Sequence, residues 1–521
     1  MNGGKIELNS NLKNISSRKK SLLLLLIIFV TALIVRFTHV PYDIPITLDG
    51  FGGYFLYALD ITRLEHLPNY TLSQSGWGEF LSLFFTIFHS DHFMDYLNLQ
   101  RTVSVIISGI TVIPIYLICR KFFSSNYSLI GALIFAFEPR IIINSTLGIS
   151  EPLYILAITL GILFFINSNK IINYLSFAFL AWATIIRPEG QFWFVAFAIV
   201  YFIRFRKNRK DCVLFLLCLA VFLLVLSPIV IHRMECCGDD AIIGRILAEI
   251  LQYENNANYS NGIDEIETYG PNFESGIKLL GWSLLPIFII FLPPGILVII
   301  RKRNYPNYLL IVVPIILSIP VFYSVSIAPD TRYVYPLFAI FCVISLFGIR
   351  WIKNNFHNEK IILSIIIISI IIGSLIFLEY KKIDYTNDLE AYQIAKLIEK
   401  KITGINGNTD VTGYLIIAEF SEIWSKTKMN NDWYVWYYED YKSKVISSNG
   451  NTLEEYINNA KESNLSHIII DDSKNNPKYL IDLIHNEKNY PYLIKEFNSN
   501  DFGFDYQVIM YKIDYERFKE L

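Results

Sequence analysis

The segment PYDIPITLDGFGGYFLYALD, residues Pro41–Asp60, follows the first long apolar run of the chain, SLLLLLIIFVTALIV at Ser21–Val35. The apolar run predicts a membrane helix, and the segment after it has the polar and flexible residues of a loop that leaves the membrane. A carboxylate at such a lipid–water boundary can accept a proton or bind a cation, because the low local dielectric strengthens its electrostatics. Asp49, beside the GFGG sequence, is the carboxylate we expect to be functional. The alternative is that the acids of this segment are solvated loop residues.

The composition assigns the whole chain to the polytopic membrane proteins. Of its 521 residues, 53% are hydrophobic and only 18% are charged, and the apolar residues occur in blocks. The net charge of −2 gives no support to nucleic-acid binding, which needs a basic face. The six cysteines show no Cys-x-x-Cys spacing, so they predict neither a disulfide framework nor a metal motif.

About eleven apolar segments are expected to cross the membrane, because most have the length of roughly 17 to 25 residues that a spanning helix needs. They are 21–38, 102–119, 128–144, 151–167, 171–187, 190–204, 212–232, 279–300, 307–327, 332–350 and 361–379. No small-residue cleavage site follows the first of them, so we interpret it as a retained signal anchor.

The basic residues predict the orientation of these segments. If the N-terminus is cytoplasmic, the dense basic clusters, such as RFRKNRK at Arg204–Lys210, all lie on the cytoplasmic side, as the positive-inside rule requires. The outer face then carries a long loop at 39–101, a second loop at 233–278 and everything after Tyr380.

The composition changes after the last apolar segment. From about residue 384 the chain is polar and alternates helix-like segments with short strand-like ones, among them VTGYLIIA at 411–418 and HIIID at 467–471. This alternation is typical of an α/β domain. The predicted organisation is a cytoplasmic tail at 1–20, a membrane domain at 21–380 and a soluble extracytoplasmic α/β domain at 381–521.

Acids and arginines recur at the outer ends of the apolar segments. They are Glu151 in ISEPLYI, Arg187 and Glu189 in RPEG, Arg332 and Tyr333 in DTRYVYP, and Arg140 in EPRIII. Pro152 suits the first turn of a helix, where the helix dipole also favours the carboxylate of Glu151, so capping is an alternative role for that residue. Each arginine either extends to the water layer or belongs to a group of cations around a phosphate, which the planar guanidinium suits.

The order of these features resembles the GT-C superfamily of integral-membrane glycosyltransferases, of archaeal or bacterial type. The superfamily includes protein O-mannosyltransferases, aminoarabinose transferases and the catalytic subunit of oligosaccharyltransferase. In that group an acid on the first outer loop is catalytic, a second acidic motif lies on the next outer turn, and the donor is a sugar on a polyprenyl phosphate. Asp49 matches the first acid and Glu151 the second. The resemblance covers roughly residues 20 to 380, as a pattern of loops.

The resemblance implies a hexosyltransferase that moves a sugar from a polyprenyl, dolichyl-type phosphate to a protein, lipid or glycan acceptor at the outer membrane face. Asp49 is then the general base, and Glu151 orients the acceptor or helps to hold a cation. The expected substrate-binding residues are Arg140, Arg187, Glu189, Arg332 and Tyr333. An Mg²⁺ or Mn²⁺ ion held by Asp49 and Glu151 is left open, because the second motif has one acid and no Asp-x-Asp pair.

Two other functions and three other acids compete with this assignment. The segment NDWYVWYYED at 431–440 has only the composition of the acceptor-binding WWDYG motif, so transfer of one sugar is favoured over oligosaccharide transfer. A transporter or flippase of lipid-linked sugar is less favoured, because the acids lie at the outer ends of the segments and no repeat is visible. Asp43, Asp60 and Glu79 compete with Asp49 for the catalytic role.

Overall fold

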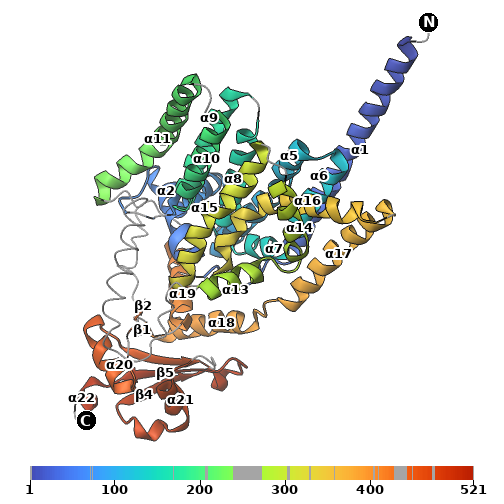
Figure 1. Cartoon of the computed structure of the whole chain (residues 1–521). Coiled ribbons are helices and arrows are strands. Elements are labelled where there is room, and N and C mark those ends of the chain that lie inside the picture. The colour runs from blue at the N-terminus through green and yellow to red at the C-terminus, as the bar shows by residue number, and fades with distance from the viewer. Residues whose placement is uncertain are drawn as a thin grey trace. The chain divides into compact units, whose positions relative to one another are not determined.

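The computed structural model of the chain describes residues 3–519, apart from 48, 71, 73, 168, 206–208, 239–272, 302–304, 328–329, 357, 403–404, 409, 428–442, 447, 449 and 472–475. The chain forms two compact units (Figure 1). Unit 1 comprises Met1–Val40, Leu64–Phe84 and Leu99–Lys382. Unit 2 comprises Pro41–Arg63, Phe85–Asn98 and Ile383–Leu521, so it combines parts of the expected first outer loop with the C-terminal region.

Unit 1 is helical, as expected for apolar segments whose backbone groups must be satisfied without water. The helices that lie wholly or mostly in it are α1 (Gly3–Phe37), α3 (Ser75–Ile87), α4 (Phe93–Ile110), α5 (Val112–Phe122), α6 (Ser125–Ala136), α7 (Pro139–Ser145), α8 (Glu151–Phe165), α9 (Lys170–Ile186), α10 (Gly190–Phe205), α11 (Arg209–Cys237), α13 (Phe273–Ser283), α14 (Phe288–Arg301), α15 (Tyr305–Ile327), the 3-10 helix η3 (Thr331–Leu337), α16 (Phe338–Asn354) and α17 (Glu359–Tyr380).

The described helices do not confirm the expected number of membrane spans. In the described part of the chain, five helical segments are long and apolar enough to cross a membrane: Arg18–Phe37, Phe93–Phe122, Val213–Cys237, Thr331–Asn354 and Lys360–Tyr380. The number is seven if each of two bent helix pairs, α6 with α7 and α13 with α14, is one span. The other expected segments correspond to α8, α9 and α10, which have 15, 17 and 16 residues, and to α15, whose apolar stretch among the described residues is Asn307–Ile319. At about 1.5 Å per residue, α8, α9 and α10 are shorter than the ~30 Å hydrocarbon layer, so the described helices do not confirm the expected eleven spans.

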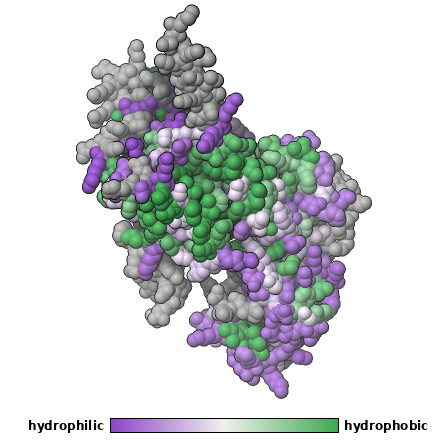
Figure 2. Space-filling view, turned by 90° about the vertical axis from the view of Figure 1, so that its right-hand side faces the viewer, coloured by the Kyte–Doolittle hydropathy of each residue, from purple (hydrophilic) through white to green (hydrophobic). Residues whose placement is uncertain are grey.

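The outward sides of several of these helices are apolar. Leu216 on α11 and Ile376 on α17 are both more than half exposed, and Figure 2 shows apolar side chains gathered in a broad band on one face of the helical part. A surface of this kind is unfavourable in water and matches lipid tails. The chain is therefore a multi-pass membrane protein.

Helix packing inside unit 1 brings distant parts of the sequence together. α8 packs beside α9, α9 beside α10 and α11, and α10 beside α15, while η3 contacts both α8 and α15. α14 and α16 approach so closely that a Cβ on Gly295 would lie 2.1 Å from the carbonyl oxygen of Ile344. Only glycine permits this contact, which is a common device where membrane helices pack. The start of α8, the α9–α10 turn and η3 consequently lie next to one another.

Unit 2 begins with the π-helix η1 (Asp49–Phe55) and α2 (Leu56–Leu64). Its C-terminal region contains α18 (Thr386–Lys401), β1 (Asn406–Gly407), α19 (Asp410–Thr427), β2 (Lys444–Val445), α20 (Leu453–Ala460), η4 (Lys461–Ser463), β3 (His467–Asp471), α21 (Lys478–His485), η5 (Glu487–Asn489), β4 (Leu493–Asn498), η6 (Ser499–Phe502), β5 (Val508–Ile513) and α22 (Tyr515–Phe518). This mixture of helices and strands agrees with the expected α/β class.

The described strands of unit 2 form two small sheets. β1 and β2 pair in parallel, and β3, β5 and β4 form an antiparallel sheet in that spatial order, with Ile469 opposite Met510. Ile468, Ile470 and Tyr511 belong to the buried core beneath this sheet. The expected strand at 411–418 is wrong, because these residues form part of the helix α19. A short apolar run lacks the periodicity that would distinguish a buried helix from a strand.

Candidate functional site

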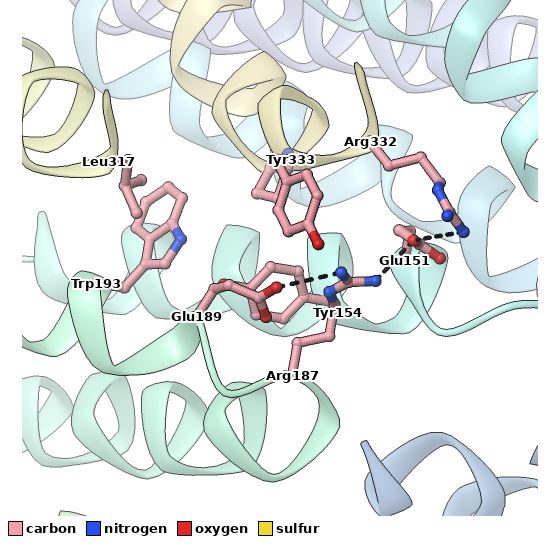
Figure 3. A pocket seen from close by; sticks show the side chains of 9 residues that line it. Glu151, Tyr154, Arg187, Glu189, Trp193, Leu317, Arg332 and Tyr333 are labelled. Carbon is pink, nitrogen blue, oxygen red and sulfur yellow. Dashed lines mark hydrogen bonds and ion pairs between the residues drawn. The ribbon is translucent and has the colours of Figure 1, made fainter. Parts of the chain in front are cut away.

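A pocket in unit 1 joins three of the motifs that the sequence singled out (Figure 3). Its free space, open solvent at the mouth included, is about 360 Å³. The lining residues are Glu151 and Tyr154 of α8, Arg187 and Glu189 of the α9–α10 turn, Trp193 of α10, Leu317 of α15, and Arg332, Tyr333 and Pro336 of η3. Residues separated by up to 185 positions therefore share one site, with both charges and aromatic rings at its wall.

Glu151 is the buried anion of this pocket. It is the first residue of α8, with Pro152 in the first turn as expected, and its side chain is only 1% exposed. Its Oε1 accepts a hydrogen bond from Nη1 of Arg187 at 2.7 Å and lies 3.7 Å from Nη1 of Arg332. Within the part of the chain that the structure describes, its Oε2 has no hydrogen-bond partner. A buried carboxylate is tolerated when cations pair with it, so the two guanidinium groups account for its position.

The turn between α9 and α10 fixes Arg187 at the pocket wall. The backbone N–H of Arg187 donates to the carbonyl of Ala183 at 2.8 Å, and that of Gly190 donates to the carbonyl of Arg187 at 2.9 Å. A Cβ on Gly190 would lie 2.6 Å from the backbone nitrogen of Thr184, so this tight turn requires glycine. Nη2 of Arg187 lies 3.2 Å from Oε1 of Glu189. One guanidinium is thus held between two carboxylates.

Arg332 is the more accessible cation of the site. Asp330 precedes η3, and its Oδ1 accepts the backbone N–H of Arg332 at 2.8 Å while its Oδ2 lies 2.5 Å from Nε of the same residue. The Arg332 side chain is 35% exposed, compared with 9% for Arg187. A guanidinium that is oriented by a carboxylate and reached by solvent is well suited to bind phosphate oxygens.

Aromatic side chains complete the wall. The guanidinium carbon of Arg187 lies 5.7 Å from the ring centroid of Tyr333, within cation–π range. Tyr154 and Trp193 are functional candidates that the sequence did not single out. Each lies one helical turn after an acid of the site, Tyr154 after Glu151 and Trp193 after Glu189, and this spacing is the signal that identifies them.

Arg140 does not line the pocket. It lies on α7, where its Nη2 donates to the carbonyl of Trp282 and its guanidinium carbon lies 5.1 Å from the Trp282 ring centroid and 5.0 Å from that of Phe377. These contacts give it protein partners away from the pocket wall. A substrate-binding role for Arg140 stays a prediction.

Asp49 is the first residue of η1 in unit 2, and its side chain lies outside the described residues, as does the segment 431–440. The part of the chain that the structure describes contains no group of three or more His, Cys, Asp or Glu side chains arranged to hold a metal ion. The free Oε2 of Glu151 suits one ligand position, so a cation shared with Asp49 stays a prediction.

The competing acids have other surroundings. Asp60, on α2, is buried and does not face water. Glu79, on α3, accepts a hydrogen bond from Oγ of Ser75, which in turn accepts one from Nη2 of Arg233 at 2.7 Å. Burial raises the pKa of the Glu79 carboxyl, and the Ser75 hydrogen bond and the Arg233 charge oppose this rise. Glu79 therefore belongs to a separate charged cluster that joins α3 to α11.

Residues 78–232 match the family described as dolichyl-phosphate-mannose-protein mannosyltransferase. The match includes Glu151, Arg187 and Glu189 of the pocket. No curated protein sequence matches the chain.

Solved structures of the oligosaccharyltransferase from Archaeoglobus fulgidus have a similar fold. The apo form is 11% identical with a TM-score of 0.56, and the similarity covers 87% of this chain and 69% of that chain. The form tethered to an acceptor peptide containing the NVT sequon gives 11% identity, a TM-score of 0.57 and the same coverage. The complex with an inhibitory peptide and a dolichol-phosphate gives 12% identity, a TM-score of 0.55, and coverage of 94% of this chain and 74% of that chain. The family match over residues 78–232 and the shared fold confirm the expected resemblance to the GT-C superfamily of membrane glycosyltransferases.

Proposed function

We propose that this protein transfers a single sugar from a polyprenyl phosphate, of the dolichyl type, to an acceptor hydroxyl at the outer membrane face. The observation that carries the proposal is the convergence of Arg187 and Arg332 on the single buried carboxylate of Glu151. The site lies at the ends of apolar helices, where a lipid-borne phosphate meets water. The membrane organisation proposed with it has the N-terminus inside, and the C-terminal α/β domain at 381–521 outside.

The proposed reaction breaks the bond between the anomeric carbon and the phosphate oxygen, and forms a bond from that carbon to the acceptor oxygen. The acceptor hydroxyl gives its proton to Asp49, which acts as general base, and the phosphate leaves with the electron pair of the broken bond. Negative charge therefore grows on the phosphate. Arg332 neutralises that charge from the open side of the pocket and Arg187 from its buried side, because electrostatic groups that are already oriented need no reorganisation.

The carboxylates around the arginines have a positioning role in this scheme. Glu151 and Glu189 hold the Arg187 guanidinium from two sides, and Asp330 fixes that of Arg332. Tyr154, Trp193 and Tyr333 supply ring faces suited to a sugar or to the first prenyl units of the donor. If Mg²⁺ or Mn²⁺ binds, Asp49 and the free Oε2 of Glu151 would hold it, and it would add positive charge near the phosphate.

The family match and one complex of a similar structure support the donor class. The matched family is described as using dolichyl phosphate mannose, and the A. fulgidus enzyme was solved with a dolichol-phosphate. Mannose on a dolichyl-type phosphate is therefore the first donor to test, with a protein among the candidate acceptors.

Transfer of a whole oligosaccharide is the second candidate, because the similar solved structures are those of an oligosaccharyltransferase. The two candidates differ in their donors. A single-sugar transferase uses a monosaccharide on a monophosphate lipid, whereas an oligosaccharyltransferase uses an assembled glycan.

The test uses membranes that contain the full chain and a panel of radiolabelled polyprenyl-phosphate sugars, including dolichyl phosphate mannose and one lipid-linked oligosaccharide. Wild-type membranes should move label from a monosaccharide donor. Asp49→Asn should insert normally but transfer about 10²- to 10⁴-fold more slowly, the usual loss of a general base. Asp43→Asn is the matched control and should be much milder. Label from the oligosaccharide alone would contradict the proposal, and a loss confined to Asp60→Asn or Glu79→Gln would move the base to that residue.

A further inference from the structure

The turn that carries Asp49 has little intrinsic stability. η1 has the sequence DGFGGYF, so three of its seven residues are glycine, which is poorly suited to helical backbone. π-helical turns are rare and occur mostly where a function requires them. A turn with this sequence needs side chains that anchor it, and its two phenylalanines, Phe51 and Phe55, are the anchors.

Phe51 and Phe55 pack into a cluster of buried rings within unit 2. Their own rings are stacked with centroids 5.5 Å apart, and Phe93 of α4 meets them edge-on at 6.1 and 5.8 Å. Phe85 of α3 lies 5.5 Å from Phe55. These contacts come from the same outer loop as the turn, so they do not by themselves involve the C-terminal region.

Phe420 of α19 is the fifth ring of the cluster, and it comes from the C-terminal region. It is fully buried, and its ring centroid lies 5.4 Å from that of Phe51, 6.1 Å from that of Phe55 and 5.4 Å from that of Phe93. It therefore contacts both anchors of the turn and the ring that supports them. More than 360 residues of chain separate it from Phe55.

The segment around Phe420 is itself held by other residues of unit 2. α19 packs beside α18, and the hydroxyl of Tyr414 donates to Oδ1 of Asp388 at 2.8 Å. The neighbouring Glu419 is also buried, and its Oε2 accepts the backbone N–H of Ser443 at 3.2 Å. Phe420 therefore projects from a fixed helix, which suits it to position a weak turn.

We propose that Phe420 is a positioning residue, through which the C-terminal region holds the Asp49 turn in its active conformation. The expected slowing of transfer rests on the proposed role of Asp49 as general base. The expected loosening of the turn does not depend on that role. Removal of the ring should loosen the turn and slow transfer. Donor affinity should change little, because Glu151, Arg187 and Arg332 belong to unit 1.

The matched control is Phe497 of β4, a buried phenylalanine of unit 2 that stacks on Phe502 at 5.2 Å and lies outside the cluster. Phe420→Leu and Phe497→Leu delete the same atoms from two buried rings of unit 2. Hydrogen–deuterium exchange of the detergent-solubilised full chain should show amides 50–55 exchanging on the order of tenfold faster in Phe420→Leu than in wild type. In Phe497→Leu the same amides should exchange as in wild type. Unchanged exchange at 50–55 in Phe420→Leu would overturn the proposal, as would equal acceleration in both variants.

Kinetics with radiolabelled dolichyl phosphate mannose give the second readout. Phe420→Leu should lower kcat by about tenfold and leave the donor KM within about twofold, the pattern of a group that acts only in the transition state. The double variant Phe51→Leu/Phe420→Leu should be scarcely worse than the poorer single variant, because the two rings act as one unit. If Phe420→Leu had the wild-type kcat although its amides 50–55 exchange faster, the positioning role of Phe420 would be overturned. Normal transfer by Asp49→Asn would instead remove Asp49 as the base and leave the exchange result standing.

Discussion

Arg36 and Arg187 are two buried arginines of the same helical unit with different surroundings. Arg36, on α1, is 0% exposed, and its Nε donates to Oγ of Ser108 at 2.9 Å. Its Nη1 donates to the carbonyls of Ala32 and Ala136 at 3.0 and 2.9 Å. Arg187 instead contacts two carboxylates at the wall of a pocket. The hydrogen-bond partners of Arg36 given above are uncharged, whereas those of Arg187 include two carboxylates, each with one oxygen that has no hydrogen-bond partner among the described residues.

The difference indicates two uses of arginine in a membrane protein. Arg36 links α1 to α4 and α6, so its hydrogen bonds stabilise helix packing, and it does not extend to the water layer. Arg187 shares Glu151 with the partly exposed Arg332, and no described residue forms a hydrogen bond with Oε2 of Glu151. A cation held among carboxylates beside open space can exchange part of that pairing for a ligand phosphate. Burial alone therefore does not distinguish the two arginines, whereas the charge and accessibility of their partners do.

The largest effect on transfer among the pocket carboxylates is expected from Glu151→Gln. The amide keeps the shape but removes the charge that both guanidinium groups share, so kcat/KM should fall on the order of 10²-fold. Glu189→Gln is the matched control and should be milder, because this side chain is 22% exposed and, among the described residues, forms an ion pair with Arg187 alone. Kinetics of the two variants with labelled donor measure the difference. Activity of Glu151→Gln within about threefold of wild type would contradict the proposed functional difference between Arg187 and Arg36.

Replacement of the pocket arginines by lysine should have the next largest effect. Arg187→Lys and Arg332→Lys keep the charge but lose the planar fork that binds a carboxylate or phosphate through two hydrogen bonds, so kcat/KM should fall about tenfold in each. The donor KM should rise more in Arg332→Lys, because Arg332 is the more exposed cation. Full activity in both lysine variants would favour a purely structural role.

A smaller effect is expected from Asp330→Asn. The pair between Asp330 and Arg332 is about one-third exposed, and such pairs contribute at most about 1 kcal/mol. The donor KM should therefore rise by no more than about fivefold, with little change in kcat. A loss as large as that of Glu151→Gln would show that Asp330 has a direct role.

The smallest effect on transfer is expected from Arg36→Met. This change leaves the Ser108 hydroxyl and the Ala136 carbonyl without their donor, which should lower the free energy of unfolding by about 1–3 kcal/mol. The donor KM of the folded fraction should match that of wild type. Thermal unfolding and kinetics of the same preparation separate the two effects, and a selective rise in KM would contradict a structural role for Arg36.

The charged residues of the pocket could be predicted from sequence, whereas its aromatic wall could not. These residues lie at the ends of apolar segments, where a charged side chain is easily recognised: Glu151, Arg187, Glu189, Arg332 and Tyr333. The positive-inside rule predicts on which side of the membrane each of these ends lies. Tyr154, Trp193 and Leu317 lie inside apolar helices, and there an aromatic or leucine is most often a packing residue. Arg140 was expected among the substrate-binding residues. It lies on α7, which turns by 52° from α6, and its guanidinium donates a hydrogen bond to the carbonyl of Trp282.

The organisation of unit 2 shows a different limit of sequence analysis. The alternation of polar helices and short strands predicted an α/β region, but the apolar run at 411–418 forms a helix. The contact of Phe420 with Phe51 depends on residues far apart in the chain, and no local pattern predicts such a pair.

The central claim is that Arg187 and Arg332 form the phosphate site of a lipid-linked sugar donor. The most direct measurement is the equilibrium binding of dolichyl phosphate to the purified full chain, compared among wild type, the double variant Arg187→Lys/Arg332→Lys, and Arg36→Met. The Kd of the double variant should rise by about tenfold or more, because both guanidinium forks are lost, and that of Arg36→Met should equal the wild-type value. Equal affinity in all three proteins, or a weakening confined to Arg36→Met, would contradict the claim.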